Sequence, residues 1–138
     1  MHNIDQLPVL ILAYNRFGKF KRCINTLHKY GVRKVFISID GPKNSNDYLI
    51  QKRIISFCEE NNLDLQIKIN YYEKNLGCRL GPIKGITWFF KNNPYGVIFE
   101  DDVLISYNCL LSFSFLLQKY KSNNTYMSLS SFNELSSQ

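Results

Sequence analysis

The alternation of short apolar runs with longer segments of helical periodicity constrains this fold most. Three runs are largely apolar along their whole length: LPVLILA (Leu7–Ala13), KVFISID (Lys34–Asp40) and GVIFE (Gly96–Glu100). Such runs are typical of strands that are covered on both faces, as in a parallel sheet. The segments between them are long enough for crossover helices. The chain therefore reads as strands alternating with helices.

A fourth run has a different pattern and indicates the edge of the sheet. In LDLQIKI (Leu63–Ile69), the polar residues Asp64, Gln66 and Lys68 alternate with apolar ones. Strict alternation is typical of a strand with one face exposed, and such strands lie at sheet edges. We also expect a short fifth strand in YMSLS (126–130).

Apolar residues at helical spacing predict four helices. Their expected inner faces are Phe17, Phe20, Ile24 and Leu27; Ile50, Ile54, Phe57 and Cys58; Ile83, Ile86 and Phe90; and Leu110, Phe113, Leu117 and Tyr120. We expect the first helix to end near Gly31 and the third to stop before Pro94. Asp47 is the expected cap of the second helix.

This order predicts an α/β fold: a three-layer α/β/α sandwich around a mostly parallel, Rossmann-like sheet. With the third strand at an edge and the first in the centre, the expected strand order is 3-2-1-4, with the further short strand added. The 138 residues suffice for one domain and are too few for two. Residues 1–138 are therefore expected to form a single domain.

Charge and cysteine content narrow the classes of partner. The formal net charge is +6, but the lysines and arginines are scattered and form no dense basic tract. We therefore expect no nucleic acid partner, although a mild positive field would help to recruit a phosphorylated small molecule. The four cysteines form no C-x-x-C pair, so metal binding by thiolates is not expected.

The sequence also bears on location. No apolar run approaches the roughly 20 residues that a membrane-spanning helix needs. The segment MHNIDQLPVLILAYNR carries no basic leader, so we expect a cytoplasmic protein without a membrane span. The oligomeric state is left open, and a surface rich in aromatic residues would favour association.

Polar residues follow each predicted strand at its carboxyl end. They are Asn15 and Arg16 after the first strand, Asp40 at the end of the second, Asn75, Gly77, Arg79 and Gly81 after the third, and Glu100, Asp101 and Asp102 at the end of the fourth. The carboxyl ends of parallel strands meet at one edge, where α/β sheets bind their ligands. These residues are therefore candidates for one binding site.

Each candidate has a structural alternative. Asn15 is suited to cap the first helix, Arg16 to lie on the surface, and Asp40 to form a turn before Gly-Pro. The acidic triplet Glu100-Asp101-Asp102 also fits a solvated loop. Three like charges at a ligand edge, however, need a cation to offset them. Carboxylate oxygens suit Mg²⁺ or Mn²⁺, which often carry substrate phosphates.

Five segments in order resemble a known family. They are PVLILAYNR, FISIDG, NLGCRLGPIKGITWFF, VIFEDDV and YMSLSSFNE. The chain resembles nucleotide-sugar glycosyltransferases of the GT-A fold. It is most similar to the group that contains animal N-acetylglucosaminyltransferase I and related bacterial proteins. The resemblance covers the donor-binding half of that family, so residues 1–138 would be the N-terminal, nucleotide-sugar-binding part of a longer glycosyltransferase.

The resemblance implies roles by position. Arg16, next to Asn15, would contact the nucleotide or its diphosphate, and Asp40 would hydrogen-bond the base. Glu100 and Asp101 would contact the ribose and the sugar, and Arg79 would lie near the diphosphate. Asp102 would be the direct ligand of Mn²⁺ or Mg²⁺. The acceptor would be a glycan or another hydroxyl compound.

The catalytic residues are not assigned, because in this family the general base belongs to the acceptor half, expected beyond Gln138. We do not assign Glu134 as that base. One alternative is a non-catalytic nucleotide-sugar-binding module or truncated fragment. Another is a Mg²⁺-dependent phosphotransferase or nucleotidyltransferase. Asn15 disfavours the phosphotransferase, because aspartyl-phosphate chemistry needs an Asp after the first strand, and AYNRFGKF is a poor match to the Gly-rich basic loop of a nucleotidyltransferase. The base, the sugar, the acceptor and the anomeric outcome are left open.

Overall fold

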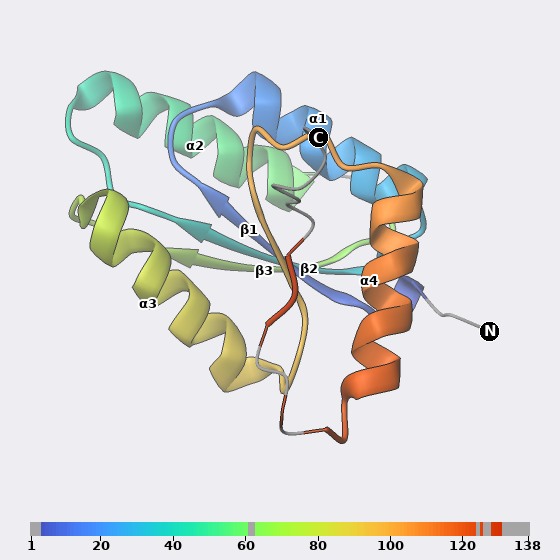
Figure 1. The fold of residues 1–138 in the computed structure, drawn as a ribbon. Coiled ribbons are helices and arrows are strands. Elements are labelled where there is room, and N and C mark those ends of the chain that lie inside the picture. Colours follow the sequence, from blue (N-terminus) through green and yellow to red (C-terminus); the bar gives the residue numbers. More distant parts are fainter. Residues whose placement is uncertain (1–3, 61–62, 124, 126–127, 131–138) are drawn as a thin grey trace, which may run out of the picture.

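The computed structural model describes residues 4–60, 63–123, 125 and 128–130, and Figure 1 shows the fold. After a short 3-10 turn at Ile4–Gln6, strands and helices alternate as the sequence predicts. The elements are β1 (Pro8–Ala13), α1 (Phe17–Lys29), β2 (Lys34–Ile39), α2 (Ser45–Glu60), β3 (Gln66–Tyr71), α3 (Gly77–Asn92), β4 (Val97–Glu100) and α4 (Tyr107–Tyr120). In these residues no helix is long and apolar enough to cross a bilayer.

The four strands form one parallel sheet in the order β3-β2-β1-β4, which confirms the predicted order. β1 lies between β2 and β4, and Leu12 is in register with Ser38 on one side and Glu100 on the other. β2 and β3 are therefore added on one side of β1, and the chain then crosses back to add β4 on the other side. Such a switch in strand order opens a crevice at the carboxyl ends of the strands.

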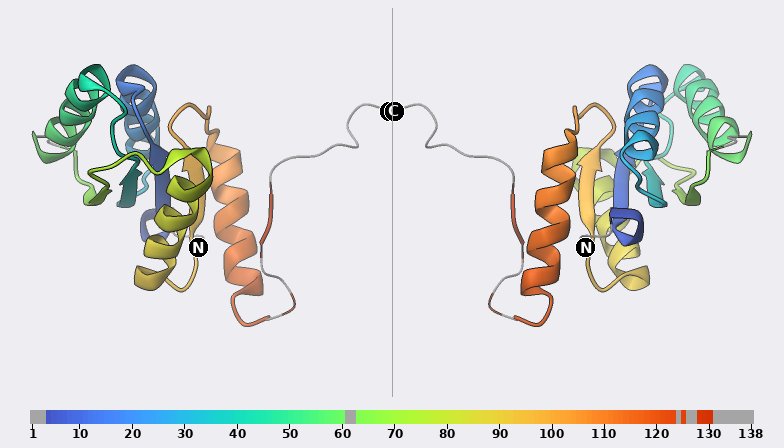
Figure 2. Two further views of the ribbon diagram at one scale, coloured as in Figure 1. Left: turned by 90° about the vertical axis from the view of Figure 1, so that its left-hand side faces the viewer. Right: turned by 90° about the vertical axis from the view of Figure 1, so that its right-hand side faces the viewer.

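Helices cover both faces of the sheet, so the three-layer prediction is confirmed (Figures 1 and 2). Successive side chains of a strand point to opposite faces. Val9 and Ile11 of β1 join the larger apolar cluster, beneath α1 and α2. Leu10 joins the smaller cluster with Phe36 and Phe89 on the α3 side. Beside β4, α4 packs through an edge-on contact between the Phe99 and Phe113 rings.

The edge position of β3 is also confirmed. It pairs with β2 alone among the described strands, and its residues Gln66 and Lys68 are exposed, as the alternation predicts.

The predicted inner face of α3 is wrong in part: Ile86 is half-buried against the smaller apolar cluster, but the other two residues are not buried. Ile83 is 53% exposed and Phe90 is 45% exposed, whereas Gly81, Gly85 and Phe89 are buried. The reason is the close approach of the helix to the sheet: a Cβ atom on Gly85 would lie 2.5 Å from Ser38 Oγ. The hydrophobic pattern could not predict this packing, because two of the three contact residues are glycines.

Two smaller predictions are also corrected. Asp47 does not cap α2 but lies within it; the Asn44 side chain accepts a hydrogen bond from the Asp47 N–H instead (2.9 Å). The expected fifth strand is not formed by residues 128–130. Its first two residues, 126 and 127, lie outside the described part of the chain.

Candidate functional site

The carboxyl ends of β1, β2 and β4 surround a cavity of about 260 Å³. Arg16, Asp40 and Glu100, which lie at the carboxyl ends of three different strands, all line it. The other lining residues are Leu12, Ala13, Tyr14, Ser38, Lys43, Asn75, Gly77, Cys78, Gly81 and Pro82. The cavity lies where strand order switches, at the expected ligand edge. Of the residues that the sequence pattern selects, Asn15, Arg79, Asp101 and Asp102 do not line it.

Arg16 is the cation that faces the acidic triplet. Its Nη2 lies 2.6 Å from Asp101 Oδ1, and its Nη1 donates to Asp102 Oδ2 at 2.5 Å. Lys19 Nζ is 3.7 Å from the same Asp102 oxygen. The Arg16 side chain is 40% exposed, Asp102 is 29% exposed and Asp101 is fully buried. One guanidinium therefore offsets two neighbouring carboxylates.

Asp101 is buried because the ends of β1 and β4 are joined at this residue. The Asp101 N–H donates to Leu12 O at 3.1 Å, and the Tyr14 N–H donates to Asp101 Oδ2 at 3.4 Å. Burial raises the pKa of Asp101, and the Arg16 guanidinium offsets only part of this rise. The paired Arg16 therefore favours the charged form of this carboxyl, whereas burial opposes it.

Asp40 organises the loop that precedes α3. Its carboxylate accepts hydrogen bonds from the N–H groups of Gly41 (2.9 Å), Leu76 (2.7 Å) and Gly77 (3.0 Å), and from Asn75 Nδ2 (3.1 Å). A carboxylate offers about four acceptor positions, so these bonds occupy its capacity within the protein. The carboxylate also satisfies amide groups at the N-terminus of α3, where negative charge is favourable.

Glycines permit this arrangement around Asp40. Gly77 has a φ of +81°, which L side chains rarely adopt. A Cβ atom on Gly41 would lie 2.2 Å from the Lys74 carbonyl carbon, so this backbone approach requires glycine.

Asp47 supports residues of the candidate site, a role that the sequence reasoning missed. Its buried carboxylate accepts from the Tyr14 hydroxyl (2.5 Å), Asn15 Nδ2 (2.7 Å) and the Lys43 N–H (3.1 Å). The bonds from Tyr14 and Asn15 lower the pKa of Asp47. Burial, together with the bond to Asp47, raises the pKa of Tyr14 to about 12. Asp47 thus fixes the loop between β1 and α1 against the start of α2.

This network also shows that Asn15 does not cap α1, which was its structural alternative. Its side chain bonds to Asp47, whereas the N-cap position of α1 is Arg16 and has no side-chain capping bond. For the role of Asp47, the sequence contains one signal, an acidic residue in the polar stretch after β2. The same signal is compatible with a simple helix cap, and from the sequence alone it is interpreted in that way.

The other candidate residues differ in where they lie. Glu100 is exposed and lines the cavity, as do Asn75, Gly77 and Gly81. Arg79 is exposed on the first turn of α3 and is not among the lining residues. Glu134 lies outside the described residues.

The carboxylate oxygens have the right chemistry for Mg²⁺ or Mn²⁺, but their arrangement does not fit a metal. Asp102 is engaged by Arg16 and is close to Lys19. Among the described residues, no three His, Cys, Asp or Glu side chains are grouped so that they could hold an ion. The expected metal ligand is therefore part of an ion pair.

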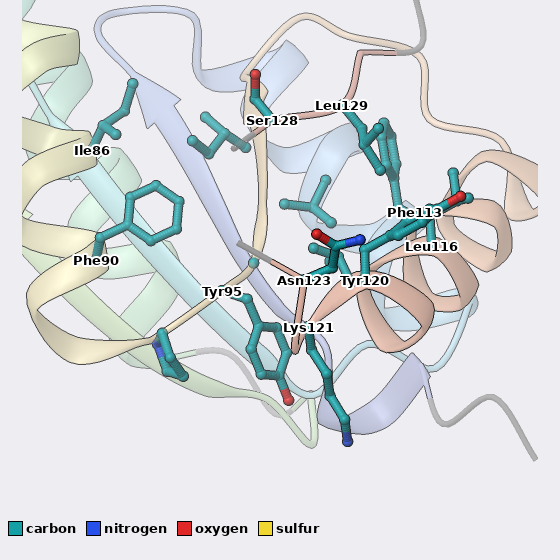
Figure 3. A pocket seen from close by; sticks show the side chains of 15 residues that line it. Ile86, Phe90, Tyr95, Phe113, Leu116, Tyr120, Lys121, Asn123, Ser128 and Leu129 are labelled. Carbon is teal, nitrogen blue, oxygen red and sulfur yellow. The ribbon is translucent and has the colours of Figure 1, made fainter. Parts of the chain in front are cut away.

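A larger cavity of about 630 Å³ lies away from this edge, beside the amino end of β4 (Figure 3). Ile86 and Phe90 of α3 and Phe113, Leu116 and Tyr120 of α4 contribute to its wall. Among the described residues that line it, Lys121 is the only charged one. Its lining offers apolar contact but no acid, so the candidate site is the smaller, charged cavity.

Comparisons with known proteins do not identify a family for this chain. No protein-family model, no curated protein and no solved structure matches the chain.

Proposed function

We propose that this chain binds a nucleotide-diphospho-sugar and is the donor-binding part of a glycosyltransferase. One observation carries the proposal: residues from the carboxyl ends of three parallel strands, Arg16, Asp40 and Glu100, line one cavity at the switch in strand order. This is the position at which α/β sheets bind nucleotides. The resemblance of the five sequence segments to GT-A glycosyltransferases points to the same class of ligand.

The charges around the cavity suit a diphosphate. Arg16 and Lys43 both line it, and Arg16 presents a planar guanidinium that can pair with phosphate oxygens through two bonds. Arg16 and Asp102 are both partly exposed, so an anion can reach the guanidinium from solvent. At about 260 Å³, the cavity is smaller than the roughly 300–1,000 Å³ that encloses a drug-sized ligand. It accommodates one part of the donor.

In the transfer step, the acceptor oxygen forms a bond to the anomeric carbon while the bond from that carbon to the diphosphate oxygen breaks. The electron pair leaves with the diphosphate, and Arg16 stabilises this developing charge. Glu100 is an exposed acceptor of hydrogen bonds and would orient hydroxyl groups of the sugar or ribose. The acceptor proton passes to a base that we do not assign.

The experiment is thermal melting with a panel of nucleotide-diphospho-sugars, with and without Mn²⁺. We expect one donor to raise the melting temperature, because a ligand that binds the folded state stabilises it. Arg16→Gln is expected to lose this shift. Arg22→Gln, on an exposed position of the same helix, is the matched control and is expected to keep it. The proposal fails if no donor shifts the melting temperature of the folded chain.

Product analysis separates the alternatives. A donor-binding part with residual transferase chemistry releases free sugar from the donor by hydrolysis. A phosphotransferase or nucleotidyltransferase cleaves a phosphoanhydride bond and leaves the sugar attached to phosphate. A non-catalytic module binds the donor and releases neither product.

A further inference from the structure

We infer that Asp40 is a positioning residue, which holds one wall of the charged cavity and leaves no acceptor for the base of a nucleotide. The resemblance to GT-A glycosyltransferases implies a different role, in which the Asp40 carboxylate accepts a hydrogen bond from the base. The effect of Asp40 on ligands rests on the proposed function. Its hold on the cavity wall is a property of the free protein and can be measured without any ligand.

The Asp40 carboxylate is already used inside the protein. Its Oδ1 accepts from the N–H groups of Gly41 (2.9 Å) and Leu76 (2.7 Å). Its Oδ2 accepts from the Gly77 N–H (3.0 Å) and from Asn75 Nδ2 (3.1 Å). A carboxylate has about four lone-pair positions, two on each oxygen. These bonds therefore leave no acceptor position for a donor on a ligand.

Asp40 is itself held in place by three other elements. Its N–H donates to Ala13 O at the end of β1 (3.1 Å), and its carbonyl oxygen accepts from Nε2 of the buried Gln51 in α2 (2.9 Å). On the α3 side, a Cβ atom on Gly81 would lie 3.2 Å from the Asp40 carboxyl carbon, so the helix lies close against the side chain. The carboxylate thus has a fixed position from which it can orient its partners.

The groups that Asp40 holds belong to the cavity. Asn75 and Gly77 line the cavity, and so does Lys43, which follows Gly41 by two residues. The Gly41 carbonyl oxygen accepts from Asn75 Nδ2 at 2.8 Å, so the two segments that Asp40 bonds are also joined to each other. Asp40 therefore fixes the loop that carries the cation Lys43 and the start of α3 at the same time.

These contacts predict which ligands respond to a change at Asp40. A residue that contacts the base affects only ligands that carry a base. A residue that holds the cavity wall affects every anion bound beside Lys43, including one without a base. Charge alone has the opposite effect, because removal of a negative charge near the cavity favours anion binding. Asp40→Asn therefore separates these three roles.

The test is calorimetric titration of the full chain with inorganic diphosphate, which has no base, well below the melting temperature of each variant. Asp40→Asn replaces one acceptor oxygen by an NH₂ group that only donates, and we expect it to weaken diphosphate binding about fivefold or more. Asp64→Asn removes the same charge from an exposed position and is expected to bind as wild type does. Unchanged or tighter binding by Asp40→Asn, or no binding by wild type, would overturn the inference.

Hydrogen exchange of backbone amides measures the hold on α3 without a ligand, and it applies even if Asp40→Asn does not fold. The first N–H groups of a helix lack partners within the helix. In wild type we expect the Leu76 and Gly77 amides, relative to their intrinsic rates, to exchange about tenfold more slowly than the Cys78 amide, because both are bonded to Asp40. Equal protection of these three amides would contradict the inference.

The proposed function fails in a different way. If Asp40→Asn weakens diphosphate binding but no nucleotide-diphospho-sugar raises the melting temperature, the role of Asp40 stands and the assignment of the donor is wrong. If a nucleotide sugar raises the melting temperature but diphosphate affinity does not depend on Asp40, the donor assignment stands and the positioning role is wrong.

Discussion

Arg16 and Asp47 fix the loop between β1 and α1 from two sides. Arg16 joins the start of α1 to Asp101 and Asp102, and Asp47 joins Tyr14 and Asn15 to the start of α2. Both contacts are between residues far apart in the chain. The sequence pattern placed Arg16 and the acids at one edge, but it could not predict which cation would face them. It assigned that role to a metal, whereas the described structure has Arg16 there.

Asp47 should affect how stability depends on pH. Its pKa is lowered in the folded state, so its ionised form stabilises the fold above the pKa of an unfolded Asp, about 3.9. This contribution is lost as the pH falls through the lower, folded value. Asp47→Asn is therefore expected to lower the melting temperature at pH 7 and to weaken its decline below about pH 4.

The measurement is the melting temperature of wild type and Asp47→Asn between pH 2 and pH 7. Asp64→Asn is the control, because Asp64 forms only an exposed pair with Arg33. If Asp47→Asn melted at the wild-type temperature at every pH, the network around Asp47 would not contribute to stability.

At the scale of elements, α3 illustrates the limit of prediction from periodicity. The existence and the C-terminal end of this helix were predicted closely, but only Ile86 of its predicted inner face packs against the core. Apolar spacing selects Ile83, Ile86 and Phe90, whereas close packing selects Gly81, Gly85 and Phe89. A glycine contributes no apolar side chain to the pattern, so its contact with the sheet becomes visible only in three dimensions. The faces of α1 and α2 are made by large side chains and were predicted correctly.

Gly85→Ala tests the close packing of α3. The added Cβ atom would lie 2.5 Å from Ser38 Oγ and 3.1 Å from Leu12, so α3 must shift away from the sheet. Overpacking of this kind typically lowers the free energy of unfolding by about 1–3 kcal/mol, which urea denaturation can measure.

Gly18→Ala is the matched control for this helix substitution. Gly18 is exposed near the start of α1, and a Cβ atom there meets nothing within 4 Å. Alanine is the better helix former, so this change is expected to be neutral or to stabilise by up to about 1 kcal/mol. A Gly85→Ala variant as stable as wild type would contradict the packing described for α3.

At the scale of the whole molecule, the fold could be predicted because the sequence patterns and the general rule for crossover connections agree. The apolar runs specify buried strands, the alternating run specifies the edge strand, and right-handed crossovers then leave few topologies. The carboxyl edge of the sheet could be located for the same reason. The contacts of Asp40 and Asp47 could not be predicted, because each depends on backbone amides or side chains that only the complete fold brings together.

Among the cavities lined by described residues, the apolar one and the charged one differ most in chemistry, and we assign the ligand to the smaller of these two. The apolar cavity beside Phe113 is larger, about 630 Å³, but the charged cavity carries Arg16, Lys43 and Glu100. A nucleotide-diphospho-sugar is anionic and needs cationic partners more than it needs volume. The location of the bound donor therefore distinguishes this account from one based on cavity size.

The most direct measurement is a map of backbone amide chemical shifts in the ¹⁵N-labelled chain during titration with the nucleotide sugar that raises its melting temperature. The account predicts that the largest changes lie at the carboxyl ends of β1, β2 and β4, around Tyr14, Arg16 and Glu100, and that they are lost in Arg16→Gln. Changes centred instead on Phe90, Phe113 and Tyr120, or changes that persist unaltered in Arg16→Gln, would contradict it.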